Sequence, residues 1–194
     1  MEEMVSNAVL FISAGSETTA TMLSATTFQL LKNPTVVQKL KDDIRGRWKS
    51  YSDITLEEVN KAPYLLAVLS ESLRYQPPVP AGFERKVVSV SQFPTYHSVH
   101  NFTDPAAFVP ERWMGEPKYA NDKRSSYQPF SFGPRNCLGK NLASAEMRLI
   151  MAKIIWSFDL ELDPRSANWM DECKVKTLWI KPELKVRVQE VARS

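Results

Sequence analysis

Residues 130–139 read Phe130-Ser-Phe-Gly-Pro-Arg-Asn-Cys137-Leu-Gly, and apolar residues at helical spacing follow them. Cys137 therefore lies in a glycine-punctuated loop directly before a predicted helix. The unpaired backbone N–H groups and the positive dipole end of a helix N-terminus favour a thiolate over a thiol. The loop thus predicts a ligand-binding cysteine, and the alternative is a buried structural cysteine.

The other residues of this loop suit a flat, negatively charged ligand. Gly133 and Gly139 let the backbone approach such a ligand closely. Phe130 can pack beside the sulfur and keep water from it. Arg135 can pair with a carboxylate of the same ligand. The loop therefore predicts a site for an anionic, planar cofactor.

This segment resembles the signature F-x-x-G-x-R-x-C-x-G of the cytochrome P-450 superfamily, the haem-thiolate monooxygenases, and it matches all of the fixed positions. The resemblance implies that Cys137 is the axial ligand of a haem b iron. It also implies that the haem is held by the other fixed residues of the loop, Phe130, Gly133, Arg135 and Gly139.

The segment 2–31 predicts one long helix, because its apolar residues recur near helical spacing. It starts without a capping residue, so we expect the chain to open inside a helix, as a fragment would. Within it, Ala-Gly-Ser-Glu17-Thr18-Thr resembles the oxygen-binding stretch of the family. The resemblance implies that Glu17 and Thr18 deliver protons to oxygen. A surface acid followed by two threonines explains this stretch about as well.

A second similarity lies on the helix predicted over 63–76. Glu71 and Arg74 stand three residues apart, which places a carboxylate and a guanidinium on one helix face. In the family, the arginine of a Pro-Glu-Arg-Phe element joins this pair, and here that element reads Pro-Glu-Arg112-Trp113. The resemblance implies a buried structural ion cluster of Glu71, Arg74 and Arg112 that supports the haem loop.

Two basic residues fall where the family often places contacts with the haem propionates. The resemblance gives this role to Arg85 and His97, although a loop histidine is more often solvated. The stretch 86–90 is β-like, and the spacing from Arg74 to Pro110 is shorter than in the family by about one hairpin. We therefore expect an incomplete sheet beside the haem, which weakens the case for Arg85 most.

The sequence as a whole predicts a mainly α protein with minor β structure, the C-terminal haem-binding half of the cytochrome P-450 fold, incomplete. We expect a single partial domain over 1–194, composed of an oxygen-binding helix remnant (1–32), the helix of the Glu71 pair (63–76), the Pro-Glu-Arg-Trp element with the thiolate loop (105–139), the helix after the cysteine (140–158) and a terminal β-hairpin (178–190).

The distribution of charge along the chain indicates which partners it could bind. Residues 112–153 hold eight Lys or Arg against three acidic residues, although the whole chain carries only +3. Such a face can bind phosphate, dock an acidic partner or simply be solvated. We expect it to dock a flavoprotein reductase and not nucleic acid, through Lys123, Arg124, Arg135, Lys140 and Arg148. The two cysteines form no CxxC pair, which fits a reducing compartment.

The resemblance implies a haem-dependent monooxygenase that inserts one oxygen atom from O2 into an apolar small molecule, with electrons from NADPH through the reductase. Residues 139–149 resemble fungal members that act on secondary metabolites. The competing hypothesis is a truncated, catalytically inactive fragment that binds haem or another chain.

No segment reaches transmembrane length. We expect the parent enzyme to be held at the endoplasmic reticulum, facing the cytosol, by an N-terminal anchor missing here, and this chain to be soluble in the cytoplasm.

Overall fold

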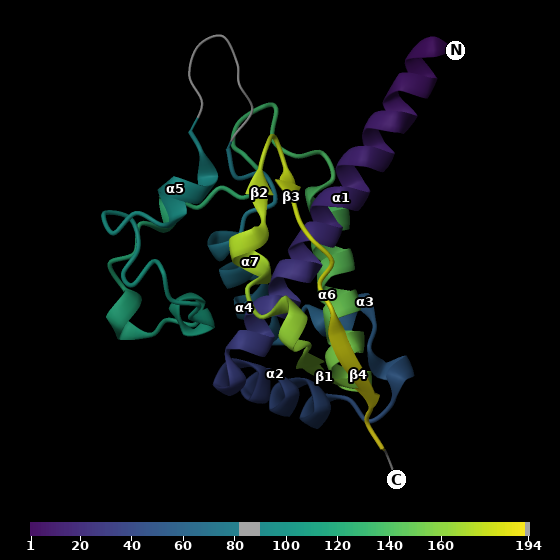
Figure 1. The fold of residues 1–194 in the computed structure, drawn as a ribbon, viewed down its shortest axis with the longest axis vertical. Coiled ribbons are helices and arrows are strands. Elements are labelled where there is room, and N and C mark those ends of the chain that lie inside the picture. Colours follow the sequence, from purple (N-terminus) through teal and green to yellow (C-terminus); the bar gives the residue numbers. More distant parts are fainter. Residues whose placement is uncertain (82–89, 193–194) are drawn as a thin grey trace.

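A computed structural model of the chain describes residues 1–81 and 90–192 (Figure 1). Its long helices are α1 (Glu2–Lys32), α2 (Pro34–Arg47), α4 (Pro63–Tyr75) and α6 (Lys140–Ser157). The shorter helices are η1 (Tyr51–Asp53), α3 (Leu56–Val59), α5 (Gln92–Tyr96), η2 (Pro110–Trp113), η3 (Pro117–Tyr119), η4 (Arg124–Ser126), η5 (Pro164–Ser166) and α7 (Trp169–Glu172). The strands are β1 (Phe158–Leu162), β2 (Lys174–Val175), β3 (Trp179–Ile180) and β4 (Val186–Glu190). The mainly α class is confirmed.

Local signals in the sequence set the helix boundaries. Asn33 separates α1 from α2: its side-chain amide donates a 2.7 Å hydrogen bond to the carbonyl oxygen of Gln29 and so caps the end of α1. Pro34 then opens α2 at a position where no backbone N–H is needed. The hydroxyl of Thr55 accepts a hydrogen bond from the Glu58 N–H and caps α3 in the usual way.

The long helices pack against one another around a common core. Their buried residues recur at helical spacing, as amphipathic helices require. The innermost include Leu40 and Ile44 on α2, Leu65 and Leu69 on α4, and Met151 and Ile155 on α6. Burying one such side chain stabilises the fold by about 1.5–3 kcal/mol.

Only the second half of α1 joins this core. Residues 3–16 are exposed, and burial begins near Thr19. The first half projects beyond the other helices (Figure 1). It leaves large apolar side chains in solvent: Met4, Val5, Val9, Leu10, Phe11 and Ile12. A helix that is apolar on all sides is normally surrounded by other protein, so this half offers a wide contact surface.

The predicted terminal hairpin over 178–190 is wrong. β4 pairs antiparallel with β1, from Phe158 opposite Glu190 to Leu162 opposite Val186, whereas β3 pairs with β2. The connection 181–185 is not a tight turn, because η5 and α7 hold it: the Trp169 indole donates to the Pro182 carbonyl oxygen and the Lys185 N–H donates to the Ser166 hydroxyl. No strand was expected at 158–162, so the partner of β4 was missed.

Two earlier expectations fall on residues 82–89. Arg85 and most of the β-like stretch 86–90 lie outside the described residues. Within 1–81 and 90–192, no helix combines the length and apolar character that crossing a bilayer requires.

Candidate functional site

The loop 130–139 is closed by its own backbone hydrogen bonds. The Cys137 N–H donates to the Phe130 carbonyl oxygen at 2.9 Å, and the Asn136 N–H donates to the Gly133 carbonyl oxygen at 3.1 Å. Gly133 has φ of +88°, in the left-handed region that favours glycine. The Cys137 carbonyl oxygen then accepts from the Lys140 N–H at 3.4 Å, where α6 begins. Cys137 thus lies at the N-terminal end of a long helix.

The Cys137 thiol is free and exposed. Large apolar side chains beside it also face outward: Phe132 is 82% exposed and Leu138 is 87% exposed. A Cβ atom added at Gly139 would approach the Cys137 sulfur only to 3.9 Å, an ordinary contact. The loop therefore exposes the sulfur together with two large apolar side chains.

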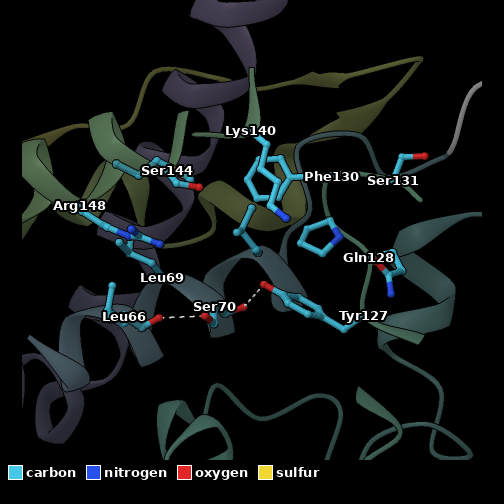
Figure 2. A pocket seen from close by; sticks show the side chains of 13 residues that line it. Leu66, Leu69, Ser70, Tyr127, Gln128, Phe130, Ser131, Lys140, Ser144 and Arg148 are labelled. Carbon is cyan, nitrogen blue, oxygen red and sulfur yellow. Dashed lines mark hydrogen bonds between the residues drawn. The ribbon is translucent and has the colours of Figure 1, made fainter. Parts of the chain in front are cut away.

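A pocket of about 330 Å³ lies between α4, the segment 127–131 and the start of α6 (Figure 2). The Tyr127 hydroxyl donates to the Ser70 carbonyl oxygen at 3.0 Å, and burial raises the pKa of Tyr127 well above its usual range. Lys140 and Arg148 line this pocket and also the adjoining hollow over α3. Two of the five basic residues expected at a docking face therefore share one groove.

The other three basic residues are placed differently. Arg124 donates to the Arg112 carbonyl oxygen at 2.5 Å, and its guanidinium lies 5.8 Å from the Trp113 ring, so it is engaged within the fold. Lys123 is exposed near η4, and Arg135 is exposed in the cysteine loop.

Glu71, Arg74 and Arg112 meet in one buried ion cluster. Arg74 binds both oxygens of Glu71, at 3.0 and 2.8 Å, and Arg112 reaches the same carboxylate at 3.0 Å. Arg74 also donates to the carbonyl oxygens of Tyr96, Pro105 and Ala107. These bonds tie α4 to the irregular segment 96–113. The cluster therefore fixes the part of the chain that leads into the cysteine loop.

Two members of this cluster were not predicted. Asp122 accepts a 2.6 Å bond from Arg112, and both side chains are buried. The Trp113 indole donates to Glu71 at 2.9 Å. No spacing rule marked Asp122. Trp113 was noted only as a substitute for phenylalanine, although its N–H was the available signal.

Glu17 and Thr18 lie where the exposed half of α1 gives way to the buried half. The Thr18 hydroxyl donates to the Ala14 carbonyl oxygen at 2.6 Å, within its own helix, and α1 continues uninterrupted. Glu17 forms an ion pair with Lys181, which no sequence signal had indicated.

His97 ends α5 among aromatic rings. It stacks on Phe93 with ring centroids 4.1 Å apart, and its Nδ1 atom lies 2.9 Å from the Phe93 carbonyl oxygen. The Tyr75 ring meets it edge-on. Burial lowers the pKa of His97. These contacts make His97 part of the packing, and its contact with a haem propionate stays a prediction.

A family model described as Cytochrome P450 matches residues 1–188. The chain belongs to the cytochrome P450 family. It is 56% identical to the cytochrome P450 monooxygenase traB of Penicillium crustosum, over 99% of this chain and 42% of that protein. It is 48% identical to the cytochrome P450 monooxygenase lcsI of Purpureocillium lilacinum, over 99% of this chain and 40% of that protein. It is 46% identical to the averantin hydroxylase of Dothistroma septosporum, over 96% of this chain and 39% of that protein.

The chain spans about two fifths of the length of these cytochrome P450 relatives. The alignment with the Penicillium protein runs over 211 positions, although this chain has 194 residues. That relative therefore carries internal residues without a counterpart here. Such a shortening was expected between Arg74 and Pro110, and the alignment length does not place it.

Membership of the cytochrome P450 family implies a haem, and the cysteine loop fits that group. A porphyrin needs an apolar surface with an accessible metal ligand. The loop offers both, because it exposes the Cys137 thiol and the apolar side chains of Phe132 and Leu138.

Proposed function

We propose that this chain carries the haem-thiolate site of a cytochrome P450 monooxygenase, with Cys137 as the axial ligand. The observation that supports it is an exposed thiol just before α6, in a loop that also exposes the apolar side chains of Phe132 and Leu138. Bound haem supplies the reductive activation of O2 and the transfer of one oxygen atom to a substrate C–H bond.

The protein's contribution at this site would be to present the Cys137 sulfur from a loop of fixed shape. Because the Cys137 N–H is engaged by the Phe130 carbonyl oxygen, the loop is held in one shape before any ligand binds. Phe130 would keep water from the sulfur once the haem is bound, and Arg135 would pair with a haem propionate.

On α1, Glu17 and Thr18 deliver protons from solvent to the site. The Thr18 hydroxyl donates its hydrogen bond to the Ala14 carbonyl oxygen, so the lone pairs of the Thr18 oxygen remain able to accept a hydrogen bond from outside the helix. Glu17 takes protons from solvent, because its side chain is partly exposed, and passes them to this hydroxyl.

The substrate we propose is an apolar small molecule, such as a fungal secondary metabolite. One relative is named as an averantin hydroxylase, and the two others are named as cytochrome P450 monooxygenases. O2 is the co-substrate. NADPH provides electrons through a flavoprotein reductase, whose acidic surface would meet the groove lined by Lys140 and Arg148. The whole enzyme would work at the endoplasmic reticulum.

A second candidate is an inactive fragment that binds haem or another chain. The exposed first half of α1 favours it, since six large apolar side chains stand in solvent there. Under this hypothesis the chain takes up haem without turning over substrate.

The test is haem uptake by the purified chain, followed by reduction under carbon monoxide. Wild type should give the red-shifted absorption band of a thiolate-bound haem. Cys137→Ala should lose it. Cys173→Ala is the matched control and should keep it, because Cys173 is half-buried, donates to the Trp169 carbonyl oxygen, and has its pKa raised by burial. An unchanged spectrum in Cys137→Ala would refute the proposal. Turnover with a reductase then separates the enzyme from the inactive fragment.

A further inference from the structure

An ion pair joins the middle of α1 to the chain just after β3. The ammonium group of Lys181 binds Oε1 of Glu17, across 164 residues of sequence. The Lys181 side chain is only 18% exposed, whereas that of Glu17 is 46% exposed. The lysine therefore approaches from inside the fold and the acid from its edge.

The position of Lys181 is fixed by anchors on both sides. Trp179, two residues earlier, is buried and donates through its indole to the Pro77 carbonyl oxygen at 2.7 Å. Pro182, the next residue, accepts through its carbonyl oxygen from the Trp169 indole at 2.9 Å. Trp169 in turn packs on Phe28 of α1, with ring centroids 5.4 Å apart. A lysine held between two such anchors loses little further freedom when it binds an acid.

The same contact turns Glu17 away from Thr18. Glu17 Oε1 accepts from Lys181 and, at 3.4 Å, from the Thr21 hydroxyl one turn further along α1. The Thr18 hydroxyl is engaged with Ala14 in the opposite direction along the helix. The two groups that should exchange a proton are thus both held by other partners.

We propose that Lys181 is a positioning residue for Glu17. It holds the carboxylate in a resting orientation, and Glu17 must leave Lys181 before its proton can reach the Thr18 oxygen. This inference rests on the proposed function of Glu17 and Thr18. It adds a third residue, contributed by the C-terminal part of the chain, to the machinery of α1.

The contact between Lys181 and Glu17 is tested on the haem-free chain by cross-linking with a water-soluble carbodiimide. This reagent converts a carboxylate into an O-acylisourea, and the amine of a lysine in contact attacks the acyl carbon, which forms an amide and releases a urea. Wild type should yield a peptide pair joining Lys181 to Glu17 by mass spectrometry. Lys181→Arg and Glu17→Gln should lack it. The Lys39–Glu111 pair, at 2.7 Å, is the internal control and should link in every variant. A missing Lys181–Glu17 link beside a present Lys39–Glu111 link would overturn the inference.

The effect on protons is tested on the haem-loaded chain with a reductase. The measured quantity is hydrogen peroxide released per NADPH, a ratio that a smaller amount of folded protein does not change. Lys181→Met should shift this ratio by about two- to fivefold, the range of a partly exposed ion pair, while Lys181→Arg should stay near wild type. Equal ratios in all three proteins would overturn the positioning role. A cross-link without a thiolate band would instead refute the proposed function and leave the contact standing.

Discussion

The indole nitrogen of Trp113 lies 2.9 Å from Oε2 of Glu71 and donates a hydrogen bond to it. Glu71 is fully buried and already binds Arg74 and Arg112. The family's phenylalanine at this position has no such donor. In this chain the aromatic ring therefore satisfies a carboxylate lone pair as well as filling space.

We predict that Trp113→Phe lowers the free energy of unfolding by about 1.5–3 kcal/mol, the usual contribution of a hydrogen bond to a charged group. Urea unfolding followed by circular dichroism measures the change. Tyr51→Phe is the control, because Tyr51 is half exposed and should tolerate the change. Equal midpoints for Trp113→Phe and wild type would show that the bond contributes nothing.

Asp122→Asn should destabilise the fold more strongly, by about 3–5 kcal/mol, because it leaves Arg112 short of a buried counter-charge. The matched control is Asp104→Asn, since Asp104 pairs with Lys118 at the surface. Thermal unfolding of the two variants compares them. A control that is as unstable as Asp122→Asn would contradict the assignment.

His97 should make stability depend on pH. Burial lowers its pKa below the ordinary value of 6.5, so the unfolded chain takes up a proton at a higher pH than the folded chain does. The neutral His97 side chain therefore contributes its full share of the folding stability above pH 6.5. This contribution declines as the pH falls from 6.5 toward the lower pKa of the folded state. His97→Phe, which can still stack on Phe93, should flatten the fall in unfolding midpoint from about pH 7.5 to about pH 5.5. His100→Gln, at an exposed site, should not.

Replacing Lys140 and Arg148 by glutamine should slow reduction by a flavoprotein reductase. The loss of rate should be larger at low salt, because the Debye length, over which charges act, is about 30 Å at 0.01 M and only about 8 Å at 0.15 M ionic strength. Lys174→Gln with Lys176→Gln removes the same charge from exposed positions on and beside β2 and serves as control. Equal stopped-flow reduction rates in the two double variants would show that the groove is not the docking site.

The exposed half of α1 should exchange its amide hydrogens fast. Residues 3–16 lack packing, and an isolated helix of about this length is marginal in water. Deuterium exchange should therefore be rapid there and slow around Met22, which is fully buried. Uniform protection along α1 would mean that another chain or a second copy covers its first half.

Much of the candidate site was predictable because its signals are local. A cysteine between glycines, directly before apolar residues at helical spacing, predicts its own position at the start of α6. Glu71 and Arg74 share a face because their spacing is that of a helix turn. Arg112 needed the family resemblance, because no short-range rule links it to α4.

The sequence alone determined the long helices, the cysteine loop and the family, since each depends on residues close together along the chain. Only the tertiary structure decided that β4 pairs with β1, that Asp122 and Trp113 complete the ion cluster, and that Lys181 holds Glu17. The physical reason is that such contacts depend on which surfaces pack together. A charge or a strand in the sequence has many possible partners, and packing of the core selects one.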